Sequence, residues 1–132
     1  VAKGKKIVWF VGDSSLDNKH WLYPNGFEQK TDCKFTDDSF TGDAPNGYEK
    51  ILKPARSIKD VCYHFNVELQ SAGSSFACIN AAVEESTVSD RYGTLLEHDV
   101  FVQEHLEDGD VIVVSLGGNE RAGTWTGRQR HC

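Results

Sequence analysis

The sequence has little that would suit a membrane or a nucleic acid. Its longest uninterrupted apolar stretches are only long enough for a β-strand, so no membrane span is expected. Lys and Arg number 14 against 20 Asp and Glu, a net charge of -6, which argues against nucleic acid as a partner. The four cysteines show neither a Cys-x-x-Cys pair nor the Cys/His spacing of a zinc site. We therefore expect no metal and no other cofactor.

The cysteines also bear on the compartment. Cys62 and Cys78 lie among apolar residues and are expected to be small buried thiols, whereas Cys33 and Cys132 fall in polar segments and could pair or react. An apolar core without a disulfide framework favours a reducing compartment or an organelle interior. The first residues lack an adequate signal-peptide core. Because the sequence begins at Val1 and not at a Met, the question of a removed upstream targeting peptide stays open.

Apolar runs alternate with helical patterns along the chain. Continuous apolar runs at Ile7–Val11, Phe76–Ile79 and Val111–Leu116 predict strands covered on both faces, which is typical of a parallel sheet in an α/β domain. Helical patterns cover about 55–70 and 97–106, the second interrupted by polar residues. In the first helix we expect Ile58, Val61, Cys62, Phe65 and Leu69 to face the core and Lys59, Asp60, Asn66 and Gln70 to face solvent.

The chain is long enough for one domain, which we place at residues 1–120. A stretch rich in Gly, Asp, Asn and Thr at about 23–54 predicts a long loop, and loops of that length are usually functional or mobile. Residues 121–132 contain three arginines and no acidic residue, so they form a distinct basic tail.

Polar motifs follow each of the three predicted strands. They are Gly12–Asn18, Asn80–Thr87 and Gly117–Glu120. The carboxyl ends of parallel strands lie at one edge of a sheet, where ligands bind in open α/β folds. Taken alone, the first motif is typical of a helix cap, and an anion or mononucleotide site is a weaker alternative because it has no phosphate-cradling glycine series.

Taken together, the three motifs resemble the SGNH, or GDSL-like, hydrolases. Gly12-Asp13-Ser14 is similar to the nucleophile motif of that family, and the other two segments to its second and third motifs. The resemblance implies a three-layer, flavodoxin-like fold and hydrolysis of an ester, an acyl or acetyl ester of a carbohydrate or lipid. It implies Ser14 as nucleophile, Asn119 as a side-chain oxyanion donor, and the backbone N–H groups of Ser14 and Glu85 as oxyanion donors.

Two departures from the family pattern point to an impaired site. Glu85 stands where the family has an oxyanion-hole glycine, and its negative charge would oppose the developing oxyanion. The downstream Asp-x-x-His motif of the family is absent, since His131 lacks the preceding Asp. His20 does end an Asp-x-x-His sequence, but it lies too close to Ser14 along the chain to reach across the site. His64, His98 and His105 fall on predicted helices, so no general base is assigned.

The sheet also has fewer strands than the resemblance implies. Only three of the five strands are found, so the apolar segment Val111–Leu116 would be an open edge that a protein partner should cover, with the 121–132 tail contacting the same partner. The chain is then either part of a longer hydrolase or a complete, degenerate domain. In both cases we expect an SGNH-type esterase that is inactive when this chain is on its own. The alternative function is that of a non-catalytic structural subunit of a larger assembly.

Overall fold

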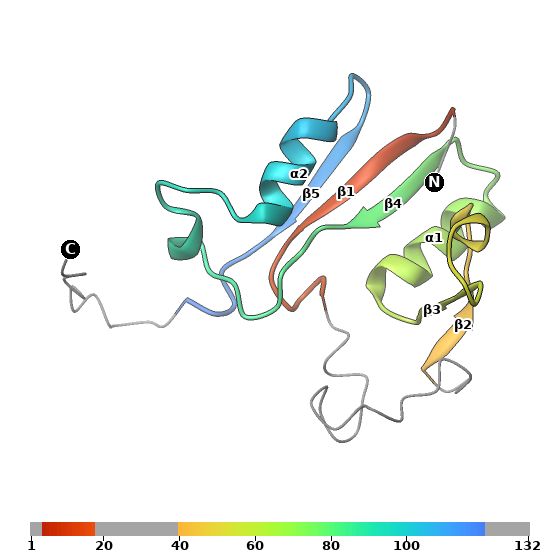
Figure 1. The fold of residues 1–132 in the computed structure, drawn as a ribbon, viewed down its shortest axis with the longest axis horizontal. Coiled ribbons are helices and arrows are strands. Elements are labelled where there is room, and N and C mark those ends of the chain that lie inside the picture. Colours follow the sequence, from red (N-terminus) through yellow and green to blue (C-terminus); the bar gives the residue numbers. More distant parts are fainter. Residues whose placement is uncertain (1–3, 18–39, 121–132) are drawn as a thin grey trace.

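A three-stranded parallel sheet is the centre of the fold (Figure 1). The structure is a computed structural model of the chain and describes residues 4–17 and 40–120. The sheet contains β1 (Lys6–Gly12), β4 (Phe76–Asn80) and β5 (Val111–Ser115) in the order β4-β1-β5, so the first strand lies in the middle. The three predicted strands and the small α/β fold are therefore confirmed.

One helix lies on each face of the sheet, which gives three layers. On one face, α1 (Val61–Ser71) covers β4 and β1, and the core there contains Val8, Phe10 and Cys78. On the other face lies α2 (Glu97–His105), whose Val102 packs with Trp9 and Ala81. Alternate residues of β1 thus supply both cores, as expected for a central strand buried on both faces.

A short antiparallel pair replaces part of the predicted loop and part of the predicted helix. It consists of β2 (Thr41–Asp43) and β3 (Arg56–Ile58), with a 3-10 turn, η3 (Tyr48–Lys50), between them. The helix therefore begins at Val61 and not near residue 55. The Asp60 carboxylate accepts a hydrogen bond from the Tyr63 N–H (2.7 Å) and so caps the helix.

The predicted polar face of α1 is wrong at Asn66, which is buried. Its side chain is 1% exposed, whereas Phe65, predicted to be buried, is 37% exposed. The Asn66 amide accepts a hydrogen bond from the Cys78 N–H (2.9 Å) and donates to the Cys78 carbonyl (2.9 Å). Asn66 is buried because it satisfies the outer backbone groups of β4, which has a neighbouring strand only on its β1 side.

Cys62 and Cys78 are buried and free, as expected, and the interaction with the Cys62 side chain, together with burial, raises the pKa of Cys78. Cys33 and Cys132 lie outside the described residues. None of the helices in the described ranges is both long enough and apolar enough to cross a bilayer.

Candidate active site at the carboxyl edge of the sheet

The three motifs that follow the strands meet at one edge of the sheet. The Gly118 N–H, after β5, donates to Oδ2 of Asp13, after β1 (3.3 Å). The Ser86 hydroxyl, after β4, donates to the Gly12 carbonyl (3.0 Å), and the Val83 N–H donates to the same oxygen (2.9 Å). Side chains and backbone groups of the loops therefore hold residues 12–17, 80–88 and 116–120 together, as the sequence predicted.

Asp13 organises the turn that carries the predicted nucleophile. Its carbonyl accepts hydrogen bonds from the N–H groups of Leu16 (3.1 Å) and Asp17 (3.0 Å), and its Oδ1 accepts one from the Ser15 N–H (2.9 Å). Burial disfavours the charged carboxylate, but hydrogen bonds from Ser15 and from the backbone of the glycines after β5 outweigh burial and lower the pKa of Asp13. Asp13 therefore caps a turn, since no helix follows it within the described residues, and its carboxylate also joins two loops.

Ser14 and Ser15 differ in their surroundings. The Ser15 side chain is exposed, and its hydroxyl shares a hydrogen bond with the hydroxyl of Ser115 at the end of β5 (2.7 Å). Ser14 is half-buried, and within the described residues neither its hydroxyl nor its N–H has a hydrogen-bond partner. A free hydroxyl beside a free N–H at the start of a turn can approach a ligand directly.

Glu85 adopts the backbone conformation that glycine favours. Its φ is 59°, and its side chain is exposed. Such left-handed values are uncommon for residues other than glycine, asparagine and aspartate. The position predicted from the resemblance thus has a glycine-like backbone, but it carries a side chain and a carboxylate.

Asn119 and Glu120 attach the third loop to the second. The Asn119 amide donates to the Ser86 carbonyl (3.1 Å), and the Glu120 carboxylate accepts hydrogen bonds from the Val88 N–H and the Ser89 hydroxyl. An amide group has two N–H donors, so this contact leaves one of them for a ligand. Asn119 and Ser14 are brought to the same edge, but no direct contact joins them.

An ion pair behind the loops was not predicted from the sequence. Arg91 and Asp99 are paired (Nε to Oδ2, 2.8 Å), and their side chains are 10% and 8% exposed. The Arg91 guanidinium also donates to the Gly12 carbonyl (3.3 Å) and to the Ser86 hydroxyl (3.0 Å). The sequence signal was Asp99 itself, an acidic residue interrupting the apolar face of a helix, because a buried carboxylate needs a cationic partner.

No general base is found for Ser14 among the described residues. His64, His98 and His105 are all exposed on helices, and the His105 ring contacts the Phe101 carbonyl (2.8 Å). His20 and His131 lie outside the described residues, so their predicted lack of a role stays a prediction. The described part of the chain also shows no group of three or more His, Cys, Asp or Glu side chains that could hold a metal ion.

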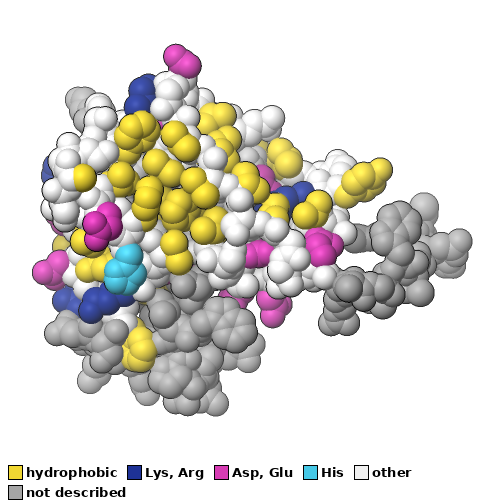
Figure 2. Space-filling model, turned by 180° about the vertical axis from the view of Figure 1, so that it is seen from behind, with side chains coloured by type: hydrophobic (Ala, Val, Ile, Leu, Met, Phe, Trp, Pro, Cys, Tyr) yellow, Lys and Arg dark blue, Asp and Glu magenta, His cyan; other side chains and the backbone are white. Residues whose placement is uncertain are grey.

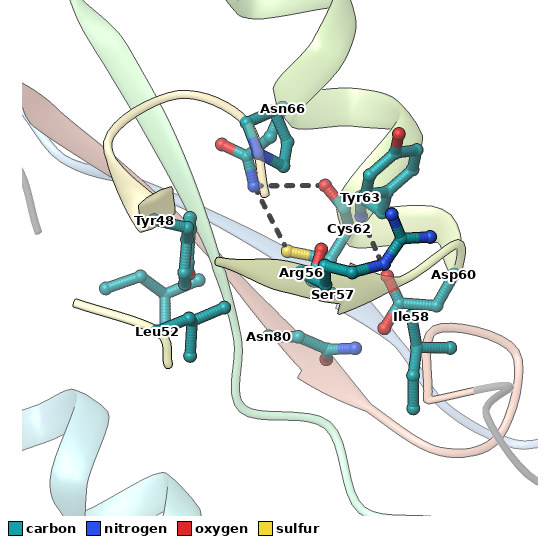
Figure 3. A pocket seen from close by; sticks show the side chains of 12 residues that line it. Tyr48, Leu52, Arg56, Ser57, Ile58, Asp60, Cys62, Tyr63, Asn66 and Asn80 are labelled. Atoms are coloured by element: carbon teal, nitrogen blue, oxygen red, sulfur yellow. Dashed lines mark hydrogen bonds between the residues drawn. The ribbon is translucent and has the colours of Figure 1, made fainter. Parts of the chain in front are cut away.

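A mainly apolar cavity lies beside the outer edge of β4 (Figure 3). Its volume is about 430 Å³, and its walls come from η3, β3, α1 and β4. Asn80 lines this cavity, and its side-chain amide donates to the Leu16 carbonyl in the turn after Ser14 (3.0 Å). The cavity therefore adjoins the candidate site through Asn80, but Ser14 and Asn119 do not line it.

Comparison with known proteins adds no relative. No protein-family model, curated protein or solved structure matches the chain.

Proposed function

We propose that the edge formed by the three loops is the nucleophile side of an SGNH-type ester hydrolase site, with Ser14 as the nucleophile. The observation that carries this proposal is the Asp13 carboxylate, which binds the N–H groups of Ser15 (2.9 Å) and Gly118 (3.3 Å) and so holds the first and third motifs together. Preorganised elements of this kind are needed for acyl transfer, because the nucleophile and the oxyanion donors must act on one carbonyl group.

Three donors would hold the oxyanion in this proposal. They are the backbone N–H of Ser14, the backbone N–H of Glu85 and the second side-chain N–H of Asn119. Removing a single donor of this kind typically lowers the rate by two to three powers of ten. The Glu85 carboxylate opposes the negative charge of the intermediate, so acyl or acetyl esters would react slowly here.

The missing base limits the proposal to slow chemistry. A serine hydroxyl is a weak nucleophile unless an adjacent base removes its proton. None of the described histidines contacts Ser14. We therefore propose that the chain alone reacts with activated reagents at Ser14 but turns over ordinary esters little or not at all.

A serine-directed fluorophosphonate tests this proposal directly. The purified chain is incubated with the probe, and the labelled peptide is identified by mass spectrometry. We expect a label on Ser14 that is lost in Ser14→Ala and retained in Ser15→Ala, the matched control one residue away. Release of product from an activated short-chain ester should stay close to the uncatalysed rate. A native chain that leaves Ser14 unlabelled would contradict the nucleophile assignment.

A non-catalytic structural subunit is the second candidate. The observation that favours it is the exposed surface of β5, where Val111, Ile112, Val113 and Val114 are each at least 37% exposed. Contiguous exposed apolar side chains of this kind often mark a protein interface. If Ser14 takes no label while the chain forms a defined complex, the structural function is supported and the hydrolase function is rejected.

A further inference from the structure

The cavity beside β4, which the proposed ester reaction does not use, has the size and lining of a small-molecule site. Its volume of about 430 Å³ lies within the range of about 300–1,000 Å³ that is typical of such sites. Protein interiors are otherwise close-packed, and voids larger than a water molecule are few. The apolar part of the lining includes Tyr48, Leu52, Ile58, Cys62, Tyr63 and Ile79. The cavity is therefore suited to an apolar ligand.

Hydrogen bonds hold the walls of the cavity in place. On one side, the Tyr48 hydroxyl of η3 donates to the Cys78 carbonyl of β4 (2.8 Å). On the other side, β3 is paired with β2, and Asp60 caps α1 by accepting from the Tyr63 N–H (2.7 Å). Figure 3 shows these two walls on either side of β4, with Tyr48 in one and Ile58 in the other. A site that is already formed loses little conformational entropy when a ligand binds.

The charged groups of the walls are balanced and bound to the protein. The Arg56 guanidinium donates to the Thr41 carbonyl (3.1 Å) and hydroxyl (3.0 Å) and pairs with Asp43 (3.4 Å). Asp60, which is buried, supplies the opposite charge. Burial raises the pKa of Tyr48, so its hydroxyl stays a neutral donor. The walls therefore favour a neutral ligand, because a charged one would lose its hydration without gaining a free counter-ion.

Asn80 offers a hydrogen-bond donor in this lining. Its Oδ1 accepts from the Ala82 N–H (3.0 Å), and its Nδ2 donates to the Leu16 carbonyl (3.0 Å). An amide group has two N–H donors, so the second is left for a ligand. The amide of Asn66, by contrast, is used by backbone groups of α1 and β4.

We propose that this cavity binds a neutral, mainly apolar small molecule with a hydrogen-bond acceptor, which takes the second side-chain N–H of Asn80. Contact with the apolar walls supplies most of the affinity, and the hydrogen bond fixes the orientation of the ligand. Ser14 does not line the cavity, so this site is distinct from the proposed ester site.

Titration of the full chain with acetophenone tests this proposal, because acetophenone is a neutral aromatic molecule with one carbonyl oxygen. In amide NMR spectra, the largest shift changes should come from the residues that line the cavity. Ser57→Phe and Leu52→Trp place larger side chains in its walls, and each should weaken binding by about tenfold or more. Benzoate, which has the same ring and a carboxylate of similar size, should also bind about tenfold more weakly or worse.

Two controls separate the cavity from other apolar surfaces. Ser71→Phe adds the same side chain as Ser57→Phe, at an exposed position of α1 outside the cavity. Val113→Lys alters the sheet face opposite α2, where Figure 2 shows hydrophobic side chains gathered; Val113 is 37% exposed and lies beside Phe10 on that face. Both controls should bind acetophenone like the unchanged chain.

Several outcomes would overturn the proposal. They are no binding up to the solubility limit of acetophenone, unchanged binding in the folded Ser57→Phe and Leu52→Trp variants, and weaker binding in Val113→Lys, which would assign the signal to surface adsorption. Benzoate that binds as tightly as acetophenone would overturn the neutral ligand class. Circular dichroism checks folding; if both enlarged variants unfold, shift changes of the unchanged chain that lie outside the cavity lining overturn the proposal. None of these outcomes depends on the labelling of Ser14, so the ligand site and the hydrolase function are tested separately.

Discussion

Replacing Asn66 with alanine should severely weaken the fold, although Asn66 is a polar residue on a helix. Its side chain makes four hydrogen bonds to nitrogen and oxygen atoms of Asn46, Cys62 and Cys78, at 2.8–3.0 Å, and a fifth to the Cys62 sulfur (3.4 Å), in a position that is 1% exposed. Tyr48 still binds the Cys78 carbonyl after the change, so the Cys78 N–H is the main group left buried without a partner. An orphaned group costs about 1–3 kcal/mol, and each lost hydrogen bond about 1 kcal/mol.

We therefore expect Asn66→Ala to lower the free energy of unfolding by about 3 kcal/mol, after allowance for partial relaxation. Total stabilities of domains are about 5–15 kcal/mol, so the loss is large. Urea unfolding followed by circular dichroism measures it, with Glu68→Ala as the control because Glu68 is exposed on the same helix. A difference between the two variants below about 1 kcal/mol would refute the view that Asn66 closes the β4 edge.

Asn66→Asp separates hydrogen bonding from packing. Aspartate keeps the oxygen that accepts from the Cys78 N–H, but its second oxygen faces the carbonyl groups of Cys62 and Cys78. Burial and this repulsion should raise the pKa of the new carboxyl above its ordinary value of about 3.9. A raised pKa in the folded state means that stability is greatest at low pH and is lost as pH rises, so acidification should partly rescue this variant.

Three further outcomes follow from particular contacts. Gly12→Ala should prevent pairing of β1 with β5, because the new Cβ would lie 2.0 Å from the Ser115 carbonyl oxygen. The control is Gly118→Ala, whose new Cβ would lie 3.6 Å from Oδ2 of Asp13. Measured by circular dichroism, the control should melt like the unchanged chain. Arg91→Met should lower the free energy of unfolding by about 3–5 kcal/mol, because it leaves the Asp99 carboxylate buried and unpaired. The double variant with Asp99→Asn should recover part of that loss. Urea unfolding measures both. Burial disfavours the charged form of Asp110, but hydrogen bonds from Ile7 and Trp9 outweigh burial and lower its pKa. Its contribution to stability is therefore present above pH about 3.9 and is lost as pH falls through the lower folded value, and Asp110→Asn should reduce this acid sensitivity in unfolding measured against pH.

The sequence was most informative where burial is continuous. The apolar runs located β1, β4 and β5 to within one residue at each end, because strands covered on both faces contain few polar positions. The polar residues that follow them were correctly placed at one edge, since parallel strands end together. For the same reason, the fold class predicted that these loops would contact one another, although it did not predict individual hydrogen bonds such as that of Ser86 with Gly12.

Other parts were not predictable from local pattern. Asn66 was assigned to the polar face because periodicity counts side-chain polarity, whereas the unpaired backbone of Cys78 determines its position. Residues 55–58 continued the helical pattern, yet β3 forms there because β2 supplies a strand partner and Asp60 caps the helix after it. Both errors arise from contacts between distant segments, which no window along the sequence contains.

Glu85 shows why the architecture of the loops does not by itself establish turnover. Hydrogen bonds fix the backbone on both sides of it, from the Val83 N–H to the Gly12 carbonyl (2.9 Å) and from the Ser86 hydroxyl to the same oxygen (3.0 Å). The residue between these anchors takes a φ of 59° even though it carries a side chain. These contacts with the end of β1 hold the left-handed turn whether or not its N–H ever meets an oxyanion. Since these hydrogen bonds do not involve a general base, a chain without a base would keep the loop. Reactivity at Ser14 is therefore the property that distinguishes an esterase from a structural subunit.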